Sequence, residues 1–147
     1  MQETAVRFAI CDDDKVYAEK MKALILQTFH LPQPVECVIY LNQEQILKCY
    51  REDKIDIVFM DIEFGDTIGF QVARRLSMQD SQLAVVYMTN YEHYITEAFV
   101  CRPLGFIRKS HAEDDLQIAG QEIRRFIGQK YSRFVFGGGM AVVEVPL

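Results

Sequence analysis

Acidic side chains end two apolar segments of this 147-residue chain, and their grouping is the pattern best suited to chemistry. Asp61 follows the apolar run of residues 55–60, and Asp12 and Asp13 follow the run of residues 5–11. Such runs are typical of buried strands in a parallel sheet, whose carboxyl ends open into the crevice where α/β proteins bind ligands. Two carboxylates about 4 Å apart repel by about 4 kcal/mol at an effective dielectric constant near 20. A bound divalent cation would remove that repulsion, so the pattern predicts a metal site.

Two further polar residues, Thr89 and Lys109, follow the next two predicted strands and would meet the same edge. Their types suit phosphoryl transfer, because a hydroxyl and an ammonium can contact phosphoryl oxygens and neutralise developing charge. Mg²⁺ is the expected metal, held by a few carboxylates, and a further carboxylate can serve as the nucleophile. Taken alone, Asp13 or Asp14 is explained as a helix N-cap, Thr89 as a turn residue and Lys109 as a surface charge. Asp61 alone is explained equally well as a structural loop acid. Their order at successive strand ends indicates a shared site.

Strand-like and helix-like segments alternate five times along the chain. The predicted strands cover residues 6–10, 35–40, 55–60, 83–88 and 104–108. Between and after them, apolar residues recur at helical spacing. Strands separated by helices of this length predict right-handed crossovers and a parallel sheet that is covered on both faces.

Local capping signals predict where three of the helices begin. Asn42 with Gln45 three positions later forms a capping box, and Ser110 with Glu113 forms a second one. Thr67 is the expected cap of the helix between them. These signals place helix starts directly after the loops that follow the predicted strands.

The C-terminal segment has a different pattern. Gly128 stands where the last helix is expected to end. Residues 133–136 and 140–145 are β-rich runs around three glycines, which predicts a hairpin. A single hairpin is marginally stable in water. We therefore expect residues 131–147 to begin a second domain, or to pair with a partner elsewhere.

Composition restricts the class of protein. The length predicts one domain, and half of the residues are apolar, which is enough for a buried core. A net charge of −5 argues against nucleic-acid binding by this segment. No apolar run approaches the roughly 20 residues of a membrane span, and the N-terminus does not resemble a signal peptide. We therefore expect a cytoplasmic protein with reduced, packed thiols at Cys11, Cys37, Cys49 and Cys101.

The five polar residues at the strand ends, in this order, resemble the receiver domain of two-component response regulators over residues 5–129. The resemblance implies an α/β fold, a flavodoxin-like (βα)5 doubly wound parallel sheet of order 2-1-3-4-5, over a receiver domain of residues 1–130. It implies a phosphoacceptor signalling domain, not an enzyme that turns over a substrate. The expected partner is a sensor histidine kinase.

The resemblance also implies a role for each site residue. Asp61 would accept the phosphoryl group, and Lys109 would pair with it. Asp13, Asp61 and the backbone carbonyl of Glu63 would ligate Mg²⁺, whereas Asp12 would act mostly through water.

A conformational switch is implied as well. Thr89 would move to hydrogen-bond the phosphoryl group, and the rotamer of Phe106 would follow it. The changed face would promote homodimerisation. One departure from the family is Ser110, which stands where a proline usually follows the lysine, so we expect a trans bond there or a strained cis bond.

Finer details resemble the LytTR-type transcriptional regulators. The segments that carry this resemblance are residues 11–14, 89–92, 98–99, 105–109 and 131–147. It implies control of transcription through a LytTR-like DNA-binding domain of which residues 131–147 are the linker and first part. DNA would be contacted only through that domain.

Two other functions remain open. A haloacid dehalogenase-like phosphatase would use Asp12 as its nucleophile and Asp14 as its acid, with Asp114 and Asp115 as a later motif. That interpretation leaves Asp61 without a role and gives little room for a substrate-selecting cap. The third possibility is a receiver-like interaction module that is never phosphorylated.

Overall fold

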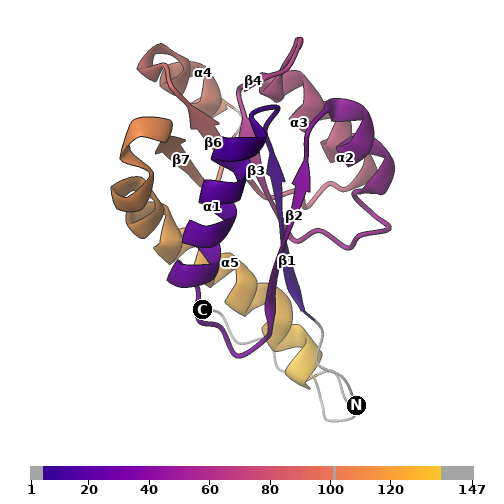
Figure 1. Cartoon of the computed structure of the whole chain (residues 1–147). Coiled ribbons are helices and arrows are strands. Elements are labelled where there is room, and N and C mark those ends of the chain that lie inside the picture. Colours follow the sequence, from indigo (N-terminus) through magenta and orange to yellow (C-terminus); the bar gives the residue numbers. More distant parts are fainter. Residues whose placement is uncertain (1–4, 101, 137–147) are drawn as a thin grey trace.

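The computed structural model describes residues 5–100 and 102–136, and its centre is a five-stranded parallel sheet (Figure 1). The order is β2-β1-β3-β6-β7, and each neighbouring pair is parallel. In strand order along the chain this is 2-1-3-4-5, which confirms the flavodoxin-like, doubly wound fold. The strands are β1 (Val6–Cys11), β2 (Val35–Tyr40), β3 (Ile57–Asp61), β6 (Val85–Thr89) and β7 (Gly105–Arg108).

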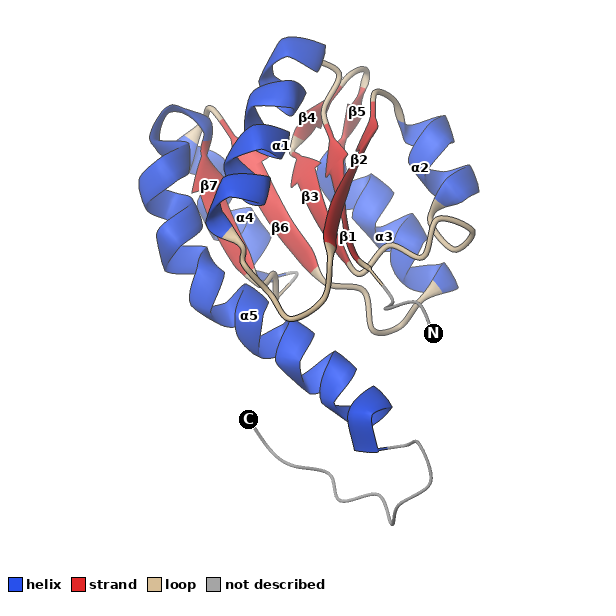
Figure 2. Cartoon of the chain, turned by 60° about the horizontal axis from the view of Figure 1, so that its bottom comes forward, coloured by secondary structure: helices blue, strands red, loops and turns tan. Residues whose placement is uncertain are grey.

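Helices cover both faces of this sheet (Figure 2). On one face lie α1 (Lys15–Thr28) and α5 (Ala112–Phe136). On the other lie α2 (Gln43–Cys49), α3 (Gly69–Gln79) and α4 (Ile95–Val100). Short elements complete the loops: β4 (Glu63–Phe64), β5 (Thr67–Ile68) and the 3₁₀ turns η1 (Glu92–Tyr94) and η2 (Lys109–His111).

The core has two halves, one on each side of the sheet. Along β1, Phe8 and Ile10 pack in the cluster that includes residues of α1 and α5. Ala9 and Cys11 pack in the cluster that includes residues of α2, α3 and α4. Successive side chains of a strand point to opposite faces, so a strand covered on both sides is apolar at every position. This is why the central strands appear in the sequence as continuous apolar runs.

Side-chain caps fix the starts of α1 and α2. The Asn42 carboxamide oxygen accepts from the Gln45 backbone N–H at 3.0 Å, which confirms the predicted cap. The Gln45 side chain in turn accepts from the Leu41 N–H at 2.8 Å. Asp14 caps α1, since its carboxylate accepts from the Tyr17 N–H at 3.1 Å. Both caps satisfy backbone donors that a helix leaves unpaired at its first turn.

Two predicted caps are wrong. Thr67 lies in β5 and pairs with Phe64 across a tight hairpin at Gly65, whose φ is +65°. The helix after it begins at Gly69, without a side-chain cap. Ser110 lies inside the η2 turn and contacts the His111 ring, and the following helix begins at Ala112. Thr67 is paired within β4–β5 and Ser110 lies within η2, so neither residue stands at the N-cap position of the helix that follows.

The predicted hairpin is wrong where the structure describes it. Residues 133–136 belong to α5, which passes through Gly128 without ending there. The second predicted strand, residues 140–145, lies outside the described residues. In Figure 2 the last turns of α5 extend beyond the end of the sheet.

Tyr131 explains why α5 continues past the expected end. Its side chain is buried, and its hydroxyl lies 2.9 Å from Asp56 Oδ2 and 3.2 Å from the Ala5 carbonyl oxygen. Asp56 is itself buried, accepts from the Arg7 N–H at 2.9 Å and forms an ion pair with Lys130 at 2.6 Å. A buried carboxylate requires such partners. These contacts attach the C-terminal half of α5 to the sheet.

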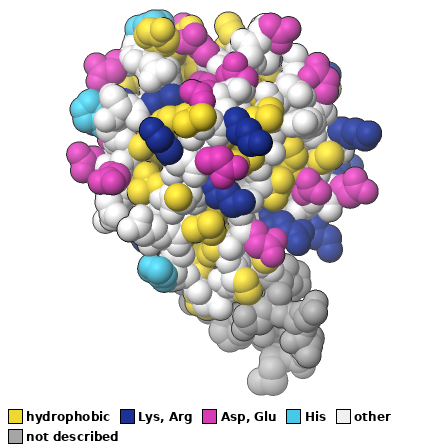
Figure 3. Space-filling view, in the orientation of Figure 1, with side chains coloured by type: hydrophobic (Ala, Val, Ile, Leu, Met, Phe, Trp, Pro, Cys, Tyr) yellow, Lys and Arg dark blue, Asp and Glu magenta, His cyan; other side chains and the backbone are white. Residues whose placement is uncertain are grey.

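The charged surface, the helices and the cysteines can be compared with what the composition predicts. On the face drawn in Figure 3, basic and acidic side chains are interspersed and do not form a single patch. Within the part of the chain that the structure describes, none of the helices combines the length and apolar content needed to cross a bilayer. Cys11 is a buried free thiol, and Cys37 and Cys49 are half-buried free thiols. Cys101 lies outside the described residues.

Candidate phosphoacceptor and metal site

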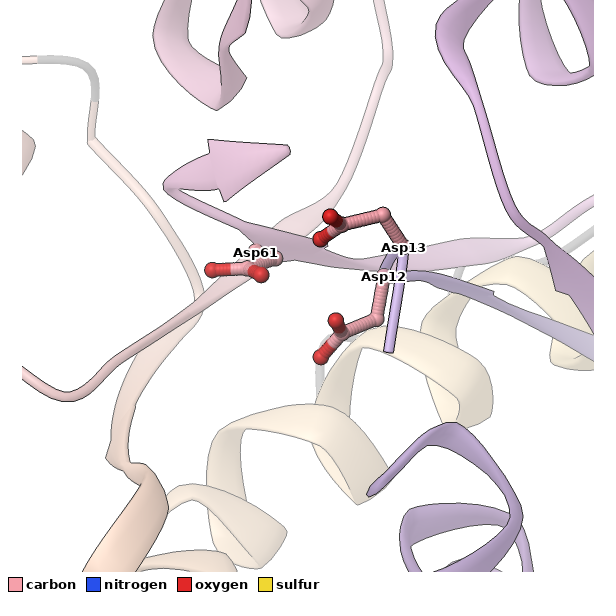
Figure 4. A group of neighbouring side chains, drawn as sticks. All are labelled: Asp12, Asp13 and Asp61. Atoms are coloured by element: carbon pink, nitrogen blue, oxygen red, sulfur yellow. The ribbon is translucent and has the colours of Figure 1, made fainter. Parts of the chain in front are cut away.

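Three carboxylates meet at the carboxyl edge of the sheet (Figure 4). Asp12 and Asp13 follow β1, and Asp61 is the last residue of β3. One carboxylate oxygen from each residue lies within 4.8 Å of the others. Asp12 and Asp61 are buried, whereas Asp13 is exposed and leaves the cluster open to solvent on one side. The structure therefore brings together the three acids that the sequence predicted.

Each buried carboxylate uses one oxygen to fix its own loop. Asp12 Oδ1 accepts from the Asp14 N–H at 2.9 Å, and Asp61 Oδ1 accepts from the Glu63 N–H at 3.0 Å. These two-residue turns are typical of Asp at the end of a strand. The remaining carboxylate oxygens, Asp12 Oδ2 and Asp61 Oδ2, face each other across the site.

Lys109 bridges these two remaining oxygens. Its Nζ lies 2.7 Å from Asp12 Oδ2 and 3.0 Å from Asp61 Oδ2. Only 10% of the Lys109 side chain is exposed. Burial opposes its charge, but the hydrogen bonds and charges of the two carboxylates outweigh burial and raise the pKa of Lys109. The ammonium is therefore a fixed positive charge beside Asp61.

The surroundings of Asp61 disfavour the negative charge of its carboxylate. Burial, followed by the negative charge of Asp12, raises the pKa of Asp61 to about 7, and Lys109 only partly offsets them. A carboxylate with excess negative charge beside it favours any cation that can enter the site. The raised pKa of Asp61 thus agrees with the repulsion between carboxylates that the sequence predicts.

Gly69 is a site residue that sequence reasoning missed. A Cβ atom at this position would stand 2.3 Å from the Asp61 carbonyl oxygen and 2.8 Å from the Met60 side chain. The Gly69 N–H donates to the Ile62 carbonyl at 2.6 Å. The glycine therefore lets the start of α3 approach the backbone of the phosphoacceptor candidate. A glycine eight residues after a strand-end Asp is the only sequence signal for it.

The two predicted switch residues lie on the neighbouring strands. Thr89 ends β6 and is buried, and its Oγ1 accepts from the Tyr91 N–H at 3.0 Å. Phe106 lies on β7, half-buried, with its ring centroid 6.3 Å from that of Tyr87. The structure thus places the Thr89 hydroxyl against its own loop. Their movement stays a prediction.

The donor set fits Mg²⁺. Mg²⁺ prefers oxygen ligands, keeps several waters and is often bound through one or two carboxylates. The cluster of Asp12, Asp13 and Asp61 supplies these oxygens, and exposed Asp13 leaves a path for the ion and its waters. Glu63 lies in β4, two residues after Asp61, and the role of its carbonyl stays a prediction. The Lys109–Ser110 bond is trans, as are all peptide bonds in the described residues.

Fold and site together define a receiver domain, a phosphoacceptor signalling module. The family model "Response regulator receiver domain" matches residues 8–120. The chain belongs to this family.

The chain is also similar to curated response-regulator proteins and to solved receiver structures. The chain is 25% identical to the sensory transduction protein LytT of Oceanobacillus iheyensis, over 87% of this chain and 52% of that protein. It is 28% identical to LytT of Bacillus anthracis, over 87% of this chain and 50% of that protein. The chain thus spans about half the length of these relatives. The response regulator TrrA of Thermotoga maritima, solved in complex with Mg²⁺ and BeF, is 20% identical with a TM-score of 0.68, over 82% of this chain and 98% of that one.

Mg²⁺ is expected to raise the thermal stability of the protein. At ten times its Kd, a ligand that binds only the folded state adds about 1.4 kcal/mol. For a domain of this size that corresponds to a rise in Tm of roughly 4 °C. Thermal unfolding followed by circular dichroism, with and without Mg²⁺, measures it. The matched control is an Asp12→Asn, Asp13→Asn double variant, and an equal rise in that variant would contradict the site.

Proposed function

We propose that the protein is the receiver part of a response regulator, phosphorylated on Asp61 by a sensor histidine kinase in the cytoplasm. The observation that carries the proposal is the Lys109 ammonium, which bridges Asp12 and Asp61 within a cluster of three carboxylates. A nucleophile, a fixed cation and a set of metal ligands are thereby within reach of one phosphoryl group.

The proposed step is an in-line displacement at phosphorus. An Asp61 carboxylate oxygen attacks the phosphorus of a phosphohistidine, and a P–O bond forms as the P–N bond breaks. The electron pair of the broken bond stays on the imidazole nitrogen, which takes up a proton. Lys109 donates hydrogen bonds to the phosphoryl oxygens as their charge changes. Asp13, Asp61 and the Glu63 carbonyl would hold Mg²⁺, with Asp12 acting mostly through water, and the bound ion would neutralise charge on the same oxygens.

The proposed output is a shift between two conformations. The phosphoryl group adds acceptor oxygens at Asp61. The Thr89 hydroxyl leaves the Tyr91 backbone and donates a hydrogen bond to the phosphoryl group, and Phe106 moves with it. Moving an equilibrium from 1:99 to 99:1 requires about 5.5 kcal/mol, and charge-assisted hydrogen bonds of roughly 1.5–3 kcal/mol each supply much of that. The changed face of α4, β7 and α5 then favours a homodimer.

The proposed downstream function is control of transcription through a LytTR-like domain, to which residues 131–147 lead. It is supported by the resemblance to two LytT proteins that are about twice as long as the matched segment. The helical course of α5 up to Phe136 gives such a linker a defined direction away from the sheet. DNA is contacted only by that further domain.

Two observations disfavour the phosphatase. Asp14, its candidate acid, caps α1 through the Tyr17 N–H. Asp115, from its later motif, accepts three hydrogen bonds from Arg108, one backbone and two side-chain, at 2.8–2.9 Å. Both carboxylates already serve the fold.

Incubation with Mg²⁺ and phosphoramidate, a small donor with a P–N bond, tests the proposal. We expect one phosphoryl group per chain by intact mass, and no steady hydrolysis of p-nitrophenyl phosphate. Steady hydrolysis would indicate the phosphatase. Absence of any label, with acetyl phosphate as well as with phosphoramidate, would indicate an interaction module that is not phosphorylated.

A further inference from the structure

The Tyr17 side chain, in the first turn of α1, contacts both ends of Lys109. The centroid of its ring lies 4.6 Å from Lys109 Nζ. Its hydroxyl lies 3.5 Å from the Lys109 backbone carbonyl oxygen, across 92 positions of sequence. One side chain therefore reaches both the charge and the backbone of the lysine that the proposed reaction uses.

The Lys109 side chain is largely buried, which makes the ring contact important. The side chain is 10% exposed, and the carboxylates of Asp12 and Asp61 take two of its three donor directions. An aromatic face attracts a cation electrostatically, more strongly where water is excluded. The Tyr17 ring thus covers part of the ammonium that the carboxylates leave free.

The hydroxyl of Tyr17 is suited to donate to the Lys109 backbone carbonyl. Burial, with the negative charges of Asp12 and Asp61, raises the pKa of Tyr17, so the hydroxyl stays protonated and donates. The distance of 3.5 Å is at the outer limit for a hydrogen bond, so the hydroxyl is the weaker of the two restraints. The contact between the Tyr17 ring and the ammonium should therefore be the main restraint on Lys109.

We propose that Tyr17 is a positioning residue for phosphorylation at Asp61, which holds the Lys109 ammonium between the two buried carboxylates through its ring. The proposal rests on the proposed function. It assigns Tyr17 no contact with the phosphoryl group: Tyr17 acts through Lys109.

Two substitutions separate the effect of the Tyr17 ring from the effect of its hydroxyl. Tyr17→Phe keeps the ring and should leave the rate of phosphorylation by acetyl phosphate within about twofold of the wild type. Tyr17→Leu keeps an apolar side chain without the ring and should slow it about fivefold or more, the effect of a cation–π contact of about 1 kcal/mol. Phe126→Leu is the matched control, since Phe126 forms a similar pair with Lys130 away from the site. It should leave the rate unchanged.

The affinity for Mg²⁺ distinguishes positioning from packing. If Tyr17→Leu only loosened the pocket, Mg²⁺ binding would weaken together with the rate. Loss of ammonium positioning moves a positive charge away from the carboxylates, so Mg²⁺ should bind as well as before or more tightly. A wild-type rate in Tyr17→Leu, or a parallel loss of rate and Mg²⁺ affinity, would overturn the proposal.

An NMR measurement tests the contact without any chemistry. Ring currents of Tyr17 should shift the Lys109 ε-protons upfield in the wild type and in Tyr17→Phe, but not in Tyr17→Leu. Absence of this shift in the wild type would overturn the proposal even if Tyr17→Leu failed to fold. A wild type that shows the shift but accepts no phosphoryl group would instead contradict the proposed function.

Discussion

Asp61→Asn is expected to abolish covalent phosphorylation of the protein. The amide is nearly isosteric with the carboxylate but lacks the nucleophilic oxygen that forms the acyl phosphate. The fold should survive, because an amide oxygen can still accept from the Glu63 N–H and because the variant removes a charge that is unfavourable in this buried position. Intact mass after incubation with acetyl phosphate and Mg²⁺ gives the label, and circular dichroism confirms the fold.

Asp12→Asn is the control for this prediction. Asp12 lies in the same cluster and contacts the same lysine, but in our account it is not the nucleophile. We expect this variant to be labelled more slowly, with label present at completion. Label that persists in Asp61→Asn and vanishes in Asp12→Asn would exchange the roles of the two residues and favour the phosphatase.

Lys109→Met should slow phosphorylation by about 10²–10³-fold. Removal of one preorganised donor from a site where charge develops typically costs that much. Methionine keeps an unbranched apolar stem without the charge, so packing of the stem is largely retained. The affinity for Mg²⁺ should not fall, because the variant removes a positive charge from beside Asp12 and Asp61. Rates from intact mass, and Mg²⁺ titration of the same samples, measure both effects.

Lys130→Met is the matched control for Lys109→Met. Lys130 also pairs with a buried carboxylate, Asp56, but far from the site in the fold. It should lower the stability of the protein without changing the rate of phosphorylation. Equal slowing by the two substitutions would mean that the effect of Lys109 is a general loss of stability.

The sheet and the acidic residues were predictable because they depend on patterns that the fold repeats. Apolar runs covered on both faces mark central strands, and β2 begins and ends as predicted. Polar residues directly after such runs must share one edge of a parallel sheet. This is why the order of residues alone predicts that Asp12, Asp13, Asp61 and Lys109 meet.

The parts that could not be predicted depend on contacts between distant segments. Gly69 is required by the backbone of Asp61, and a sequence pattern does not indicate how closely a helix start approaches a strand. Gly128 is a signal for a helix end, but α5 continues past it, and Tyr131 beyond it reaches Asp56 and the Ala5 carbonyl. Tertiary contacts therefore override local preference. Tyr17 has the spacing of a core residue, and its contact with Lys109 appears only in the folded chain.

The most direct measurement identifies the residue that carries the phosphoryl group. The wild type is incubated with Mg²⁺ and acetyl phosphate and reduced with borohydride, which converts an aspartyl phosphate to homoserine, and its peptides are sequenced by mass spectrometry. We expect homoserine at position 61 and at no other aspartate. Homoserine at position 12, or none anywhere in a sample that binds Mg²⁺, would contradict it.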